Sequence, residues 1–173
     1  MEMQKYFYTE KFTLIPEEFF TPEQGREVLV EQFSLPSDTQ VHSLALEEER
    51  AVIAYSAPQL QGDTDILPPF VAKLLSHAKT IQEYNKVVFH YSARRGISHI
   101  IIYAGEELKL ANSFKVDSFE SALYFLFLSI KGLQMNPQQC VVNVCWGIPQ
   151  QSIDMVSRFF KGVESTDLDI HII

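Results

Sequence analysis

The chain has 173 residues, of which 46% are hydrophobic and 21% charged, a composition that fits a globular protein and excludes a disordered one. No stretch approaches the roughly 18 uninterrupted apolar residues of a membrane span, and no basic region followed by an apolar run marks a secretory signal. Residues 1–83 hold 14 acidic and 6 basic side chains, whereas residues 84–173 hold 8 of each. This balance, without a dense basic stripe, argues against nucleic acid as a partner, and the lack of a long apolar stretch argues against insertion into a membrane.

The first 83 residues predict a strand, a helix, a hairpin and a second helix. Residues 10–16 form an extended run that proline stops. The helix over 21–33 begins with Thr21 as N-cap and has Gln24 at the capping-box position. Its inward face is expected to carry Val28, Leu29 and Phe33.

A hairpin is predicted over residues 41–58, with three glutamates at its turn. A helix is predicted over 66–84, after the proline pair, with apolar residues at helical spacing. These elements give the first part of the chain a small α/β lobe.

The second part predicts three short strands in a meander, over residues 85–92, 96–105 and 108–116. A helix follows, with Asp117 as N-cap and Glu120 at the capping-box position. Apolar residues surround almost all of this helix, so we expect it to be buried on more than one side.

The order then continues with a strand over 140–147, a helix over 149–162 and a last strand over 164–173. The strand at 140–147 is a continuous apolar run, which is typical of a central strand covered on both faces. Right-handed crossovers predict a mixed five-stranded sheet of order 3-2-1-4-5 with helices on its faces. This order is that of the ribonuclease H-like unit, which is also the repeated half of actin-like ATPases.

Cys140 and Cys145 are the only cysteines. Their odd separation on one predicted strand directs them to opposite faces, so they are not expected to form a disulfide. They match no zinc pattern, and reduced core cysteines favour a cytosolic, cytoplasmic location.

Three segments resemble an uncharacterised protein family of Bacteroidetes bacteria: the run over 10–20, the residues Ala111 to Phe114, and the helix over 121–137. Members of that family are described as having an actin-like ATPase fold of two such halves in tandem. The resemblance spans residues 10–165. It implies that residues 84–173 are the second, ribonuclease H-like lobe and that residues 1–83 are a partial first lobe without its opening meander. A weaker likeness, in architecture alone, is to cytoplasmic assembly platforms that use this fold for protein contacts.

Actin-like ATPases hold phosphate and magnesium with hairpins that carry glycine and aspartate. The corresponding turn here offers Gly96 and no aspartate, so ATPase activity is not expected. Arg94 and Arg95 in the same turn could attract an anion, although two arginines at a hairpin tip are usually solvated. Ribonuclease H-type nucleases need converging carboxylates, and neither residues 87–91 nor residues 141–144 contain one.

The histidines offer one further hypothesis. If the turn is centred between Arg94 and Arg95, paired residues have numbers that sum to 189, which sets His90 opposite His99 on one face. Two imidazoles are half a zinc site, and no third ligand is apparent nearby in the sequence. The alternative is a pair of sheet-surface histidines bonded to water or to neighbours.

The sequence therefore favours a non-catalytic relative of the actin-like ATPase fold, acting as a protein-interaction or scaffolding module without a cofactor. One alternative is a nucleotide-binding protein whose cleft needs a further half or a partner chain, and another is a metal-dependent enzyme at His90 and His99. Tyr91, Tyr103 and Trp146 are the candidate interaction residues. A bare sheet edge would favour a homodimer.

Overall fold

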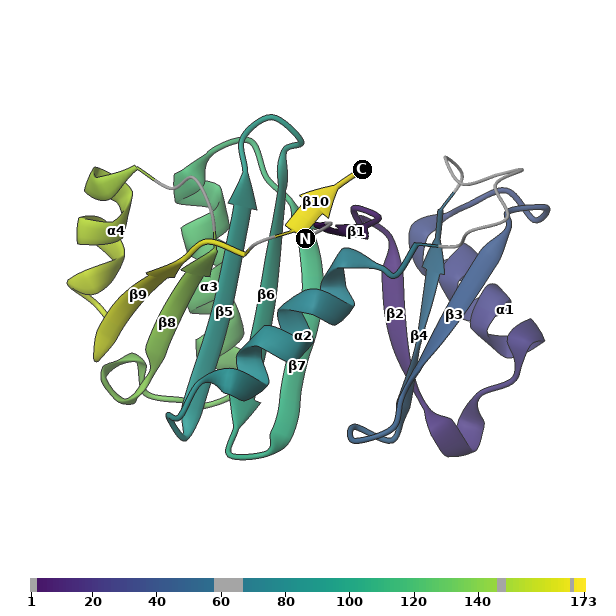
Figure 1. Ribbon diagram of the computed structural model, residues 1–173, viewed down its shortest axis with the longest axis horizontal. Helices are drawn as coiled ribbons and strands as arrows, with labels where there is room; N and C mark the ends of the chain where they lie inside the picture. Colours follow the sequence, from purple (N-terminus) through teal and green to yellow (C-terminus); the bar gives the residue numbers. More distant parts are fainter. Residues whose placement is uncertain (1–2, 58–66, 146–148, 169) are drawn as a thin grey trace. The chain divides into compact units, whose positions relative to one another are not determined.

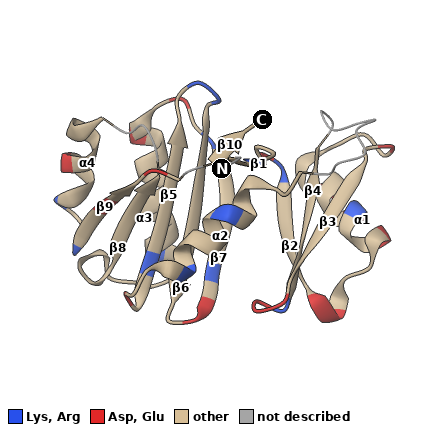
Figure 2. Ribbon diagram, viewed as in Figure 1, with Lys and Arg blue, Asp and Glu red and all other residues tan. Residues whose placement is uncertain are grey.

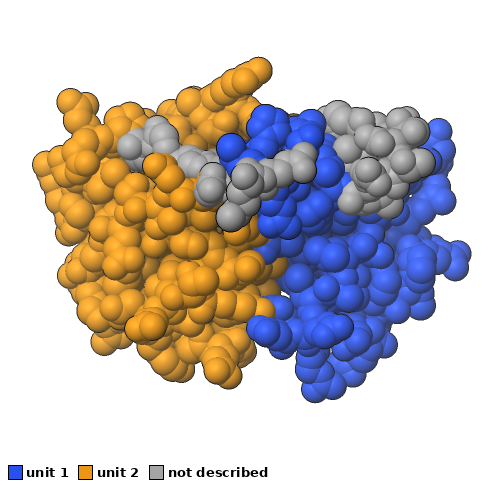
Figure 3. Space-filling view, in the orientation of Figure 1, with its two compact units in different colours: residues 1–72, 170–173 blue, residues 73–169 orange. Residues whose placement is uncertain are grey.

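The computed structural model describes residues 3–57, 67–145, 149–168 and 170–173. The chain divides into two compact units, one of residues 1–72 with 170–173 and one of residues 73–169 (Figure 3). The division into domains at residues 83 and 84 stays a prediction, because contacts within one chain do not show which part folds alone.

The first unit is built on an antiparallel sheet of order β2-β4-β3, and α1 packs on one face of it (Figure 1). A second, two-stranded sheet pairs β1 with β10 in parallel. The elements of this unit are β1 (Gln4–Tyr6), β2 (Phe12–Pro16), η1 (Glu17–Phe19), α1 (Pro22–Phe33), β3 (Val41–Leu46), β4 (Ala51–Ser56) and β10 (Ile170–Ile172).

The start of α1 is confirmed as predicted. The Thr21 hydroxyl accepts a hydrogen bond from the Gln24 backbone N–H at 3.1 Å, which satisfies one of the N–H groups that a helix start leaves without a partner. Leu29 is fully buried, but Val28 is 37% exposed, so the prediction that it faces inward is wrong. The predicted hairpin is confirmed, since β3 and β4 pair from Val41↔Ser56 to Leu46↔Ala51.

The second unit contains a mixed five-stranded sheet of order β7-β6-β5-β8-β9. The first three of its strands in the chain are antiparallel, and β8 and β9 run parallel to β5. Numbered along the chain, this is the predicted order 3-2-1-4-5. The strands are β5 (Asn85–Ser92), β6 (Ile97–Ala104), β7 (Glu107–Lys115), β8 (Val141–Cys145) and β9 (Gly162–Thr166). The helices are α2 (Phe70–Thr80), of which residues 73–80 belong to this unit, α3 (Phe119–Gly132), η3 (Pro137–Gln139) and α4 (Gln150–Ser157).

One face of this sheet forms the main core with α3 and α4. Val87 and Phe89 of β5 pack there with Leu126 and Ile130 of α3 and with Val156 of α4, and all five are fully buried. Burying a side chain of this size contributes about 1.5–3 kcal/mol of transfer free energy. The opposite face lies under the C-terminal turns of α2 (Figure 1).

Three predicted details of the second unit are wrong. The last strand is not continuous over 164–173, because β9 ends at Thr166 and β10 belongs to a different sheet. The N-cap of α3 is Ser118, whose hydroxyl accepts from the Ser121 N–H at 3.1 Å, and not Asp117. The helix predicted over 149–162 ends at Ser157.

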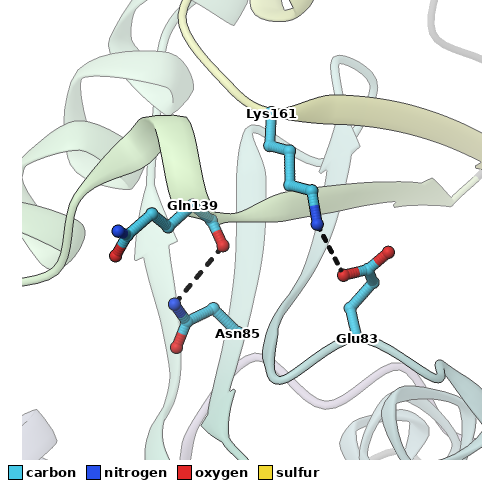
Figure 4. A network of polar contacts seen from close by, with 4 residues as sticks. All are labelled: Glu83, Asn85, Gln139 and Lys161. Atoms are coloured by element: carbon cyan, nitrogen blue, oxygen red, sulfur yellow. Dashed lines mark hydrogen bonds and ion pairs between the residues drawn. The ribbon is translucent and has the colours of Figure 1, made fainter.

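Polar contacts join the beginnings of the parallel strands (Figure 4). The Lys161 ammonium lies 3.1 Å from the Glu83 carboxylate, and the Asn85 amide donates to the Gln139 carbonyl at 3.3 Å. Both ion-pair side chains are about half exposed, so the pair contributes at most about 1 kcal/mol. These contacts hold the segments before β8 and β9 against the start of β5.

Candidate functional site

The turn between β5 and β6 is closed by its own backbone. Ser92 pairs with Ile97, the Gly96 N–H donates to the Ser92 carbonyl at 2.9 Å, and Gly96 has φ +63°. A Cβ at Gly96 would lie 3.1 Å from the Val116 carbonyl oxygen, so this position requires glycine for local geometry. Arg94 and Arg95 are exposed on the turn. Anion binding by these two arginines stays a prediction.

His90 and His99 form the predicted cross-strand pair. They are directly opposite in the register, with ring centroids 5.6 Å apart. Their exposed fractions are 4% and 0%, so both side chains are buried and do not lie on a solvent-exposed surface of the sheet. The His90 Nδ1 lies 3.3 Å from the backbone carbonyl oxygen of Cys145.

Asn143 and Cys145 of β8 extend this pair into a longer row on the same face. They pair with Val88 and His90 of β5, and laterally paired residues point to the same side of a sheet. The Asn143 Oδ1 accepts a hydrogen bond from the His77 Nε2 of α2 at 2.9 Å, which fixes the proton on that ring nitrogen. We call the five side chains the polar row: His77, Asn143, Cys145, His90 and His99.

Two groups of the polar row are uncharged at neutral pH. The pKa of His90 is lowered to about 4, mainly because the ring is buried; the contact with the Cys145 carbonyl raises the pKa, and the nearby Arg95 guanidinium lowers it. Burial raises the pKa of the Cys145 thiol to about 12. Since the thiolate is the reactive form of cysteine, this buried thiol is not an activated nucleophile.

The polar row does not assemble a set of metal ligands. Within the part of the chain that the structure describes, no group of three or more His, Cys, Asp or Glu side chains is placed to hold a metal ion. A catalytic zinc uses three protein ligands, and His90 with His99 supplies two. A metal ion at this pair stays a prediction.

The three candidate interaction residues are not gathered into one surface. Tyr103 is 1% exposed, so the expectation that it presents an exposed aromatic ring is wrong. Tyr91 is half-buried, with its ring edge-to-face against Phe119 at 5.7 Å. Trp146 lies outside the described residues.

A different apolar surface lies on α3, which was predicted to be buried on more than one side and is not. Tyr124 is 61% exposed, Leu128 is 48% exposed, and Phe159 after α4 is 46% exposed. The Phe127 ring lies edge-to-face with Phe159 at 5.2 Å, so it connects the helix to that residue. Tyr124, Phe127 and Leu128 share one helix face by their spacing. We call Tyr124, Phe127, Leu128 and Phe159 the α3 surface.

One feature of the sequence could have indicated part of this arrangement. The spacing of three and four residues between Tyr124, Phe127 and Leu128 places them on one face, although it does not show that this face is exposed. No local pattern indicates the bond between His77 and Asn143, because 66 residues separate them.

None of the helices in the described ranges is long and apolar enough to cross a membrane. No curated protein matches the sequence. The structure is similar to a crystal structure from Bacteroides thetaiotaomicron VPI-5482, described as a protein with an actin-like ATPase fold and unknown function. The TM-score is 0.77 at 16% sequence identity, and the match covers 94% of this chain and 67% of that chain. At this identity the similarity shows the fold, and it confirms the actin-like architecture predicted above.

A family model described as "Protein of unknown function (DUF3822)" matches residues 64–163, which is more than half of the chain. The matched segment begins before α2 and ends within β9, so it includes α3 and the whole polar row. The chain therefore belongs to the DUF3822 family.

Proposed function

We propose that this protein is a non-catalytic relative of the actin-like ATPases that acts by binding another protein. The observation that carries the proposal is the α3 surface. Its Tyr124, Leu128 and Phe159 side chains are between 46% and 61% exposed. Contiguous exposed apolar side chains on a folded protein mark interaction sites, and aromatic residues are enriched at the centres of interfaces.

The chemistry of the sheet supports the same proposal. The fourth strand of the sheet carries an amide, Asn143, whose oxygen is bonded to His77. The first strand carries His90, which burial keeps neutral. Neither strand supplies a carboxylate for a cation. We take residues 84–173 as a ribonuclease H-like lobe and residues 1–83 as a partial first lobe. The order of β5 to β9 supports the first assignment, although β10 lies in another sheet.

A cytosolic location belongs to the same proposal. Cys140, which precedes β8, and Cys145, which ends it, are both buried thiols, and neither forms a disulfide. Reduced cysteines are typical of proteins in reducing compartments.

The α3 surface can be tested with a charge. Leu128→Lys is expected to lower the recovery of the bound protein at least about tenfold, because a lysine at the centre of an apolar interface must lose its hydration without a partner. The measurement is quantitative mass spectrometry of proteins that co-purify with the tagged chain from cells of its source organism.

The matched control is Val28→Lys, which places the same charge at a 37% exposed apolar position on α1. Urea unfolding of both variants establishes that they fold. Equal recovery of the bound protein with wild type, Leu128→Lys and Val28→Lys would contradict a role for the α3 surface.

A second candidate function is nucleotide binding in a cleft that a further lobe or a partner chain completes. The observation that favours it is the fold match, because this chain covers only 67% of a protein with the actin-like ATPase architecture. It predicts that a longer protein binds nucleotide and that residues 1–173 alone do not.

A further inference from the structure

The three-stranded sheet of the first unit ends in an uncharged strand. Among the described strands, β3 is hydrogen-bonded only to β4, so one side of its backbone is at the edge of the sheet. Its residues Val41–Leu46 include no charged side chain and no proline, and Figure 2 shows the strand entirely in tan. Such an edge can accept a further strand.

The other outer strands of the two larger sheets carry features that discourage pairing. β2 ends at Pro16, which has no N–H to donate. β7 has an irregular register opposite Ile102 and Tyr103 and carries Lys109, and β9 carries Glu164. Irregular strands, charged side chains and proline are the common means of protecting a sheet edge, and β3 has none of them.

The register shows which backbone groups of β3 point outward. The Ser56 N–H donates to the Lys11 carbonyl and the Glu17 N–H to the Arg50 carbonyl, so the even-numbered residues of β4 bond to β2. The odd-numbered residues of β4 therefore bond to β3, where their partners are His42, Leu44 and Leu46. The N–H and C=O groups that point away from the sheet are those of Val41, Ser43 and Ala45.

The surroundings of this edge are acidic. The first unit contains 13 acidic and 4 basic residues, whereas the second contains 9 acidic and 10 basic ones. Asp38 precedes β3, and Glu47 to Glu49 follow it. If two copies paired antiparallel about Ser43, Glu48 of each would face Asp38 of the other, and like charges would oppose the pairing. The charges therefore favour a basic partner over a second copy.

A hollow of about 680 Å³ adjoins the beginning of β3. Its lining residues include Glu23, Arg26, Asp38, Val41 and His42. It lies on the α1 side of the sheet, where Val41, Ser43 and Ala45 point. Acidic groups outnumber the single arginine, so the hollow suits the long side chain of a lysine or arginine.

We propose that β3 is a docking edge for an extended basic segment of another protein, which adds to the sheet as a fourth strand and places a lysine or arginine in the hollow beside Glu23 and Asp38. The inference rests on the proposed function as a protein-binding module, but it uses a surface other than the α3 surface. Backbone bonds to Val41, Ser43 and Ala45 supply affinity, and the carboxylates select the basic sequence.

The test uses a fluorescein-labelled peptide of eight alternating lysine and valine residues, with a peptide of alternating glutamate and valine as its acidic counterpart. Fluorescence anisotropy is expected to show that the basic peptide binds and that the acidic peptide does not.

Variants of β3 and of the hollow test the two parts of the site. Ser43→Pro removes one outward N–H without removing a bond to β4, and it is expected to weaken binding about tenfold or more. Ser43→Thr keeps the N–H and is expected to bind as wild type does. Glu23→Gln with Asp38→Asn weakens binding about fivefold, and Glu18→Gln, outside the hollow, leaves it unchanged.

Hydrogen exchange locates the peptide. The amides of Val41, Ser43 and Ala45 are expected to exchange more slowly when the peptide is bound. Equal affinity of wild type and Ser43→Pro would overturn the proposal, since binding would then need charge alone. If the same amides become more protected as the protein concentration rises, without peptide, the occupant of the edge is a second copy of the chain. That result would overturn the proposal of a basic segment as the partner. Leu128→Lys is expected to bind the peptide as wild type does. The experiment therefore distinguishes a failure of the β3 proposal from a failure of the proposed role of the α3 surface.

Discussion

The free energy of unfolding is expected to fall by about 2 kcal/mol between pH 7 and pH 5 through His90 alone. Burial lowers the pKa of His90 to about 4 in the folded chain, from an ordinary 6.5. Between these values the unfolded state binds a proton that the folded state does not. The stabilising contribution is therefore complete above pH 6.5 and is lost as the pH falls towards 4.

Urea unfolding at intervals from pH 7 to pH 5 measures this effect. His90→Asn removes the titrating ring but keeps a donor near the Cys145 carbonyl, and its dependence on pH is expected to be flatter by about 2 kcal/mol over this range. Val88→Ala, on the same strand and face, lowers stability without removing an ionisable group and should keep the wild-type dependence. An unchanged pH dependence in His90→Asn would show that the folded protein does not keep this ring neutral.

Asn143→Ala is expected to destabilise the fold by about 2–3 kcal/mol. The substitution removes the acceptor of the His77 hydrogen bond, worth about 1 kcal/mol, and leaves a cavity at a site that is 3% exposed. Because His77 belongs to α2 and Asn143 to the sheet, this bond fixes the end of the helix on that face.

A double-mutant cycle separates the bond from the cavity. Combining Asn143→Ala with His77→Ala should give a coupling of about 1 kcal/mol in the free energy of unfolding. Combining it with Ser76→Ala, an exposed residue of the same helix, should give additive effects. Additivity in both pairs would mean that the contact between His77 and Asn143 contributes nothing to stability.

The sheet of the second unit could be predicted from the sequence because its signals are local. β-Branched alternation defines β5 and β6, the turn at Gly96 fixes their register, and right-handed crossovers then set the positions of β8 and β9. The opposition of His90 and His99 follows from that register. The burial of both rings could not be predicted, since it depends on elements that cover the sheet.

The features that the sequence did not reveal depend on distant residues. β1 and β10 come from opposite ends of the chain, so no local pattern shows that they pair or that the last strand is divided. The apolar composition of α3 suggested burial on several sides, but composition does not show what covers a helix. The exposure of Tyr124 and Leu128 became visible only in the structure.

The polar row and the α3 surface have different parts in the proposed function. Asn143 on the fourth strand holds a helix in place. Three of the exposed apolar side chains, Tyr124, Leu128 and Phe159, lie on and beside a helix on the other face of the sheet. A protein of this kind is expected to bind through its surface and to have no reaction centre within the sheet.

Isothermal titration of the chain with ATP in the presence of magnesium tests most directly whether this actin-like fold works without nucleotide. We expect no heat of binding up to about 1 mM ATP, because no carboxylate on β5 or β8 is available to the cation. A dissociation constant in the micromolar range would contradict the proposed function.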